Sequence, residues 1–184
     1  KIHGSVNWKL EESRGSNTTH VVRVGPQETG EMIYPSFRKY DKSRKLPYRA
    51  LMDRLNSFLD RNDVLMISVG YGFNDQHINE VLYDTLQTRP RTHLVALQYA
   101  SLSNHPGLVD WAKRLPNLMV MGPRSGVVGG RHREWALDQA FEGSAAVSSV
   151  IHTSEDEENP EGELTIGDYK EFASFLAKTA PQST

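Results

Sequence analysis

The 184-residue sequence contains no cysteine. Disulfide bonds and thiolate zinc sites are therefore excluded, and the composition fits a reducing compartment, which predicts a cytoplasmic location. The chain also lacks a signal peptide and any apolar run near the roughly 18 residues that a transmembrane helix needs. We expect neither secretion nor membrane insertion.

Neither sign of charge dominates, because 21 Lys and Arg face 23 Asp and Glu, giving a net charge of -2. A nucleic-acid-binding domain usually carries a basic face. The locally basic residues 38–45 are a candidate contact for a phosphate or a partner, but such runs are usually solvated surface. The seven histidines show no ligand spacing. We therefore expect neither direct nucleic-acid binding nor a metal.

The chain is organised around residues 63–86, DVLMISVGYGFNDQHINEVLYDTL. Residues 64–69 are apolar and rich in β-branched side chains, which predicts a strand buried on both faces. A polar turn with two glycines follows, and apolar residues then recur at helical spacing, with Asn74 or Asp75 placed as the N-cap. A strand, glycine turn and helix in this order are typical of a ligand site in an open α/β sheet. The alternative is a turn that binds nothing, since a lone G-x-G is weak evidence.

The flanking segments continue this alternation. We expect helices at residues 48–61 and 106–114 and strands at 92–99 and 116–122, which together predict an open parallel sheet with right-handed crossovers. A further helix is expected at 131–141. The glycine-rich residues 122–130 are either a loop near a nucleotide or a plain connection.

The sequence patterns at the two ends of the chain differ from the alternation of strands and helices in its centre. We expect a loop at residues 9–19 and a hairpin of the β-rich runs 20–24 and 31–34. Near the C-terminus, residues 143–163 are small or acidic and predict a flexible linker. Residues 164–184 then hold an amphipathic helix and a tail.

Three separated motifs resemble one family. Residues 1–8, KIHGSVNW, are similar to the K-[IL]-H-G-S-[IV]-N-W segment of the sirtuin-like domains of bacterial anti-phage defence proteins. Residues 32–48 resemble the P…K-Y…P-Y stretch that follows it there. Residues 69–79, VGYGFNDQHIN, resemble the motif G-Y-S-F-x-D-x-H-I-N. The resemblance is good over residues 1–86, extends to 91–122 by pattern alone, and does not cover the tail.

The resemblance implies a Rossmann-like parallel sheet and cleavage of NAD at the nicotinamide–ribose bond. His3 matches the catalytic histidine, while the turn matches the loop that contacts ribose and phosphates. Asp75 and Asn79 match positions expected to fix the turn and the helix start. From its place at a strand end, Gln98 is a candidate for the adenosine ribose or simply a polar strand terminus. The expected cofactor-binding residues are Gly4, Ser5, Gly70, Tyr71, Gly72, Phe73, Asp75 and Gln98.

The sequence departs from the family pattern at several points. Gly72 stands where the family usually has Ser, and the interval 9–32 lacks the four cysteines of protein-deacylating sirtuins, which favours the hydrolase group. The family's glycine-rich first strand and catalytic Asn precede the H-G motif and are not in these residues. We expect residues 1–142 to be the C-terminal portion of the domain, incomplete at its N-terminus. The candidate partners are the missing half-domain, a second copy of the chain and a defence partner protein.

Two functions fit these observations. The first is an NAD hydrolase with His3 as the base, since a histidine acts near neutral pH. The second is a non-catalytic module that binds ADP-ribose or a related nucleotide or regulates a partner, with a ligand-free structural remnant as a third reading. For His3, the alternative to catalysis is a histidine that satisfies a backbone group at a strand end.

Overall fold

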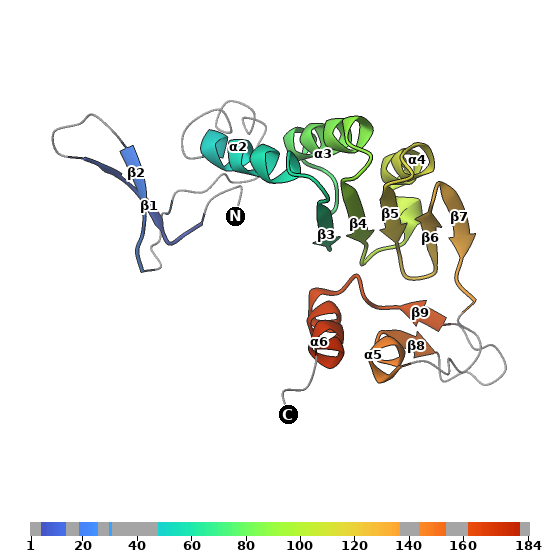
Figure 1. The fold of residues 1–184 in the computed structure, drawn as a ribbon. Coiled ribbons are helices and arrows are strands. Elements are labelled where there is room, and N and C mark those ends of the chain that lie inside the picture. Colours follow the sequence, from blue (N-terminus) through green and yellow to red (C-terminus); the bar gives the residue numbers. More distant parts are fainter. Residues whose placement is uncertain are drawn as a thin grey trace. The chain divides into compact units, whose positions relative to one another are not determined.

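The computed structural model describes residues 5–13, 19–25, 30, 48–136, 144–153 and 162–180. The chain divides into two compact units, Lys1–Asp60 and Arg61–Thr184 (Figure 1). Each unit is described by itself below. Within the described segments, no helix combines the length and the apolar character needed to cross a membrane.

Within its described residues, the first unit contains an antiparallel hairpin and one helix. Strand β1 (Trp8–Glu12) pairs with β2 (Thr19–Arg23), with Trp8 opposite Arg23. The loop expected at residues 9–19 is therefore wrong over residues 9–12, which belong to β1. The expected partner of β2, residues 31–34, lies outside the described residues. Helix α2 (Tyr48–Leu59) confirms the helix predicted at 48–61.

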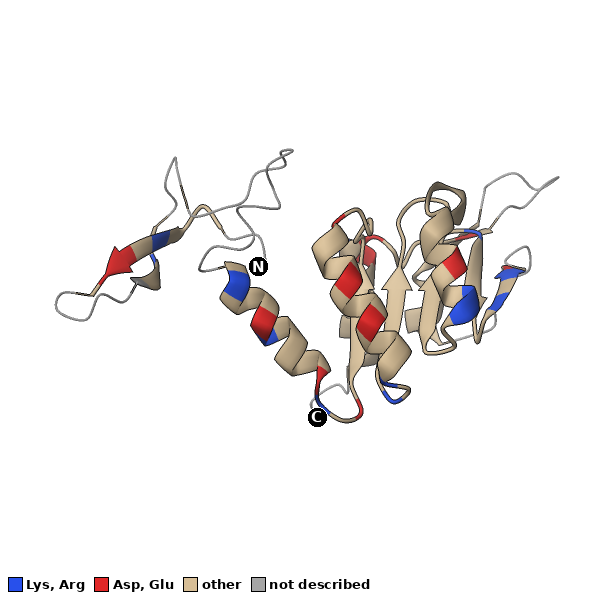
Figure 2. Cartoon of the chain, turned by 90° about the horizontal axis from the view of Figure 1, so that it is seen from above, with Lys and Arg blue, Asp and Glu red and all other residues tan. Residues whose placement is uncertain are grey.

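The second unit is built on a five-stranded sheet of order β3-β4-β5-β6-β7. Its first three strands are parallel and alternate with two helices, which confirms the predicted succession. Helices α3 and α4 lie on the same side of the sheet (Figures 1 and 2), as expected when successive right-handed crossovers run in one direction. The elements are β3 (Leu65–Val69), α3 (Gln76–Thr88), β4 (His93–Leu97), α4 (Pro106–Arg114) and β5 (Leu118–Met121).

The core lies on one face of this sheet. None of the strands β3, β4 and β5 contains Lys, Arg, Asp or Glu, whereas the helices carry charged residues (Figure 2). Leu94, Ala96, Leu118 and Val120 share one face of the pleat and are at most 2% exposed. On the other face of β3, Leu65 is 60% and Ile67 44% exposed. The expectation that β3 is buried on both faces is therefore wrong in this structure.

The expected helix at residues 131–141 is also wrong over its described part. Strands β6 (Ser125–Val128) and β7 (Arg131–Glu134) extend the sheet antiparallel, so the sheet is mixed rather than wholly parallel. Gly129 and Gly130 form a two-residue turn with φ of 55° and 77°, the backbone that a tight hairpin requires. Trp135 packs against Gly126 and donates a hydrogen bond to the Gly122 carbonyl at 2.9 Å.

The C-terminal part adds small elements at the carboxyl edge of the sheet (Figure 1). Helix α5 (Ala145–Ser148) and β8 (Ile151–Thr153) occupy part of the predicted acidic linker, and β9 (Gly162–Leu164) pairs with β8. Residues 154–161 of that linker lie outside the described residues. Helix α6 (Tyr169–Thr179) confirms the predicted terminal helix, although it begins five residues later, at the Asp168 cap.

Candidate functional site

The turn at the end of β3 has an unusual backbone. Gly70 has φ of +63° and Phe73 has φ of +52°. Positive φ suits Gly70, but it is uncommon for a bulky residue such as Phe73. The Gly70 N–H donates to the Leu97 carbonyl at 3.0 Å, which joins the turn to the end of β4. This bond sets where the turn leaves the sheet.

Asn79 lies in the first full helical turn of α3, and its side chain holds the turn at the end of β3. Its side-chain Nδ2 donates to the Phe73 carbonyl at 2.7 Å, and its Oδ1 accepts from the Tyr71 hydroxyl at 3.1 Å. The rings of Tyr71 and Phe73 contact each other, with centroids 4.6 Å apart. The prediction that Asn79 fixes the turn is confirmed. A favourable bond to its own carbonyl helps Phe73 to keep its strained backbone.

The pKa of Tyr71 is raised to about 12, chiefly by burial and in addition by the nearby Asp75 carboxylate, against a lowering effect of the hydrogen bond to the Asp75 backbone. The phenol is therefore protonated at neutral pH and acts as a hydrogen-bond donor within the turn. It is not available there as a base.

Of the two N-cap candidates in the sequence, Asn74 and Asp75, the structure selects Asp75 as the N-cap of α3. Its carboxylate accepts from the Ile78 N–H at 3.5 Å, and its side chain is buried. This carboxylate already places a negative charge at the start of the helix. A phosphate at the turn would therefore depend on the backbone N–H groups of residues 71–74 more than on the helix N-terminus.

Gln98 supports the same turn from the neighbouring strand. It is 2% exposed, and its Nε2 donates to the Tyr71 carbonyl at 3.0 Å. The structure thus gives this amide a partner in the protein, and its expected contact with an adenosine ribose stays a prediction.

The predicted site residues fall into two groups. Within the second unit, the fold brings together six of them: Gly70, Tyr71, Gly72, Phe73, Asp75 and Gln98. The other group belongs to the first unit. There Ser5 is buried and donates to the Asn7 Oδ1 at 2.6 Å, whereas His3 and Gly4 lie outside the described residues.

A small cavity opens beside the turn. Its volume is about 240 Å³, and it lies between the starts of α3 and α4. Gly72 and Phe73 line it together with Asn74, Asn79 and His105. A Cβ atom on Gly72 would meet only the Asn74 side chain, at 3.0 Å. The backbone of the turn is therefore accessible from this side.

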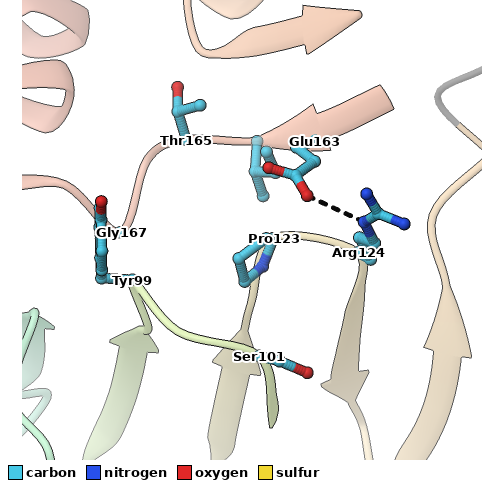
Figure 3. A pocket seen from close by; sticks show the side chains of 8 residues that line it. Tyr99, Ser101, Pro123, Arg124, Glu163, Thr165 and Gly167 are labelled. Carbon is cyan, nitrogen blue, oxygen red and sulfur yellow. Dashed lines mark hydrogen bonds and ion pairs between the residues drawn. The ribbon is translucent and has the colours of Figure 1, made fainter. Parts of the chain in front are cut away.

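A larger cavity lies at the ends of β4 and β5, which we call the strap cavity (Figure 3). Its volume is about 390 Å³, within the range of roughly 300–1,000 Å³ that is usual for small-molecule sites. One wall comes from the loops after the strands, and the other comes from residues 162–168, which we call the strap. The lining residues are Tyr99, Ser101, Pro123, Arg124, Glu163, Leu164, Thr165 and Gly167.

Backbone contacts hold the strap over the edge of the sheet. The Leu164 N–H donates to the Pro123 carbonyl at 2.8 Å, and the Thr165 N–H donates to the Val150 carbonyl at 2.8 Å. At Gly167 the backbone approaches β4 so closely that a Cβ atom would lie 2.2 Å from the Gln98 carbonyl oxygen. Glycine is therefore required at this crossing.

Two charged side chains face each other at one side of the strap cavity. The Arg124 Nε donates to the Glu163 Oε1 at 2.9 Å (Figure 3). On the opposite side lies Tyr99, which is 71% exposed. Sequence reasoning noted Arg124 within its glycine-rich stretch, but it assigned Glu163 to the acidic linker and missed Tyr99. The signal that could have found Tyr99 is its position directly after the end of a parallel strand.

The described residues contain no cluster of three or more His, Cys, Asp or Glu able to hold a metal ion. The cavities are instead lined by apolar and aromatic side chains, by backbone, amide and hydroxyl groups and by the Arg124–Glu163 pair. Such a lining is suited to an organic ligand with hydroxyl or phosphate groups.

These features define a mixed α/β protein whose cavities lie at the carboxyl ends of its parallel strands, where ligands bind in open α/β sheets. The chain belongs to the SIR2-like domain family, whose sequence profile matches residues 1–114. The match contains the H-G motif and the β3 turn, and it ends before β5 and the strap. SIR2-like domains bind NAD. A comparison with curated protein sequences finds no match.

Proposed function

We propose that this chain is part of an NAD hydrolase that cleaves the nicotinamide–ribose bond in bacterial anti-phage defence. The proposal includes a Rossmann-like fold and a cytoplasmic location. The observation that carries it is the G-Y-G-F-N-D turn, which lies at the carboxyl end of β3 and within the family-matched segment. The mixed sheet with helices beside its parallel strands is consistent with such a fold.

The residues present fit a dinucleotide. The turn at 70–73 offers close backbone approach through Gly72, which suits the ribose and phosphates. The strap cavity offers space and an exposed aromatic side chain, Tyr99, beside it. We assign the turn to the pyrophosphate side of NAD and the strap cavity to its adenosine side.

NAD supplies a leaving group that is already cationic, so the protein needs no acid to protonate it. We assign to His3 the role of a base that removes a proton from a water or from a ribose hydroxyl. The partly buried hydrogen bonds of Asn79 and Gln98 hold the turn in one conformation, which favours a fixed pose of the substrate. Because Gly72 has no hydroxyl, the turn would contact oxygens through backbone N–H groups.

The test uses NAD and mass spectrometry. We expect no measurable turnover by the 184 residues alone, because the glycine-rich strand and the Asn that the family carries before the H-G motif are not among them. Activity should appear when the natural upstream segment is fused to Lys1 or supplied by a second chain. In that protein His3→Ala should abolish cleavage and leave the melting temperature unchanged.

The matched control is His132→Ala, which removes an exposed histidine of β7. It should leave the rate unchanged. A folded His3→Ala protein that cleaves NAD at the parental rate would overturn the assignment of His3. Intact NAD under all conditions would overturn hydrolysis itself.

The second candidate function is a non-catalytic module that binds ADP-ribose. The absence of a hydroxyl at Gly72 and the occupied donors of Tyr71 and Gln98 favour it. Titration calorimetry with ADP-ribose discriminates between the two. Heat of binding without NAD cleavage by the restored protein would select the binding module. Assembly with a further copy or a defence partner belongs to either function.

A further inference from the structure

We propose that the Arg124–Glu163 pair makes the strap cavity select an adenosine ribose with a free 2′-hydroxyl over one with a 2′-phosphate. This inference rests on the proposed function, because it takes the strap cavity as the adenosine side of the site. It assigns specificity to residues beyond the family-matched segment 1–114.

The position of the pair carries the first step. Tyr99 follows β4, and Arg124 follows β5, so both lie at the carboxyl ends of parallel strands. An exposed aromatic ring next to a cavity of about 390 Å³ gives a base a surface for stacking. The pair lies on the other side of the same cavity (Figure 3). A base near Tyr99 would thus direct its ribose toward Arg124 and Glu163.

The charges carry the second step. In dinucleotide sites an acidic side chain accepts hydrogen bonds from the ribose hydroxyls, whereas an arginine accommodates a 2′-phosphate. Here both types of side chain are present, and Arg124 donates to Glu163 at 2.9 Å. The Glu163 Oε1 accepts this bond from Arg124. The remaining lone pairs of the carboxylate can accept hydrogen bonds from a ribose hydroxyl. A phosphate would meet the carboxylate charge and find the guanidinium already paired.

The backbone carries the third step, because it fixes both partners. Glu163 lies opposite His152 in the β8–β9 ladder. The next residue, Leu164, bonds to the Pro123 carbonyl, directly before Arg124. The pair is therefore held in register by the strap. Since the side chains are 58% and 47% exposed, the pair adds little to folding stability, and its variants should remain folded.

Titration of the 184-residue chain by backbone amide NMR tests the inference, since the method measures weak binding and reports folding. The probes are adenosine 5′-monophosphate and adenosine 2′,5′-bisphosphate. In the parental chain the monophosphate should bind more tightly and shift amides of residues 99–101 and 163–168. In Glu163→Gln the bisphosphate should gain about tenfold in affinity, because the carboxylate charge that repels its 2′-phosphate is removed while the positive charge of Arg124 remains.

Two further variants sharpen the result. Glu134→Gln removes the same charge from an exposed position on β7 and should leave the ratio of the two affinities unchanged. Adding Arg124→Gln to Glu163→Gln should remove the gain for the bisphosphate. An unchanged ratio in Glu163→Gln would overturn the inference. So would shifts that map away from the strap cavity, or no shifts with either nucleotide.

These outcomes are separate from those of the NAD cleavage test. The nucleotide ratio is read from binding and does not involve His3. If NAD is not cleaved but Glu163→Gln shifts the ratio of the two nucleotide affinities toward the bisphosphate, the inference stands. Cleavage of NAD with an unchanged ratio would remove the inference and leave the proposed function.

Discussion

At the end of β3, the side chains of Tyr71, Asn79 and Gln98 bond to the turn itself. At the ends of β4 and β5, by contrast, Tyr99, Arg124 and Glu163 face a cavity. Both places lie on the carboxyl edge of one sheet. The motif residues thus build a rigid turn, while residues without a motif surround the larger open space. In this sheet the motif residues bond mainly to one another, and the wider cavity is lined by residues outside the motif.

The largest expected effect is on the strap. Gly167→Val adds side-chain atoms where even a Cβ atom would lie 2.2 Å from a backbone oxygen, so the strap must move away from β4. We expect the strap cavity to lose its wall and nucleotide-induced NMR shifts there to disappear. Overpacking of this kind costs about 1–3 kcal/mol or more in the free energy of unfolding.

Gly107→Ala is the control for this variant. A Cβ atom at Gly107 meets nothing within 4 Å, and alanine is the better helix former by about 1 kcal/mol. This variant should be as stable as the parent or more so. Chemical denaturation of both variants checks the contrast, which a parental unfolding curve for Gly167→Val would contradict.

The next effect is on the turn. Asn79→Ala removes the donor to the Phe73 carbonyl and the acceptor for the Tyr71 hydroxyl. Leaving such groups without partners should lower the free energy of unfolding by about 1–3 kcal/mol. Hydrogen exchange should accelerate at residues 70–75 and remain slow in β4 and β5.

Gln87→Ala changes an exposed amide on the same helix and should stay within about 0.5 kcal/mol of the parent. If both variants lose stability equally, the turn does not depend on Asn79 in the way that its hydrogen bonds indicate.

A third effect appears in alkali. The pKa of Tyr71 is raised to about 12, so the fold favours the neutral phenol. The stability from this group is fully present below the ordinary tyrosine pKa of about 10 and is lost as the pH rises through 12. Ultraviolet titration of the parent minus Tyr71→Phe should show one phenol ionising near pH 12. A difference spectrum that titrates near pH 10 would show that Tyr71 is not buried in the turn.

The smallest expected effect concerns Ser68, whose buried Oγ has no hydrogen-bond partner among the described residues. Ser68→Ala removes a polar atom that gains nothing from burial. The melting temperature should stay the same or rise slightly. A clear fall in scanning calorimetry would indicate that the hydroxyl has a partner in solution.

The parallel core was predictable because its signals are local. The apolar runs of β3, β4 and β5 and the helical spacing in α3 and α4 come from neighbouring residues, as does the Asp75 cap. The β6–β7 hairpin was missed although Gly129-Gly130 between short runs is a hairpin signal. The local sequence of residues 131–135, RHREW, favours the start of a helix, but the pairing of Gly126 with Arg133 outweighs that preference.

The site was predictable to a smaller extent. The motif located the turn, and the role of Asn79 followed from it. The strap cavity did not follow, because it depends on contacts between residues that are far apart in the sequence. In the sequence Glu163 is simply one residue of an acidic run. Its place beside the cavity follows from the hydrogen bond between the Leu164 N–H and the Pro123 carbonyl. No local pattern reports that Gly167 lies against Gln98.

The strap also has an evolutionary consequence. It comes from a separate segment, so substitutions at Glu163 or Thr165 leave the hydrogen bonds of Asn79 and Gln98 in place. Under the proposed function, substitutions in the strap can then change the nucleotide preference of the strap cavity without lowering the stability of the β3 turn. Substitutions in the turn can likewise leave that preference unchanged. Gly167 limits this freedom, because the crossing at Gln98 admits no side chain. Diversification of the strap would therefore be expected at its outer positions, around a fixed glycine.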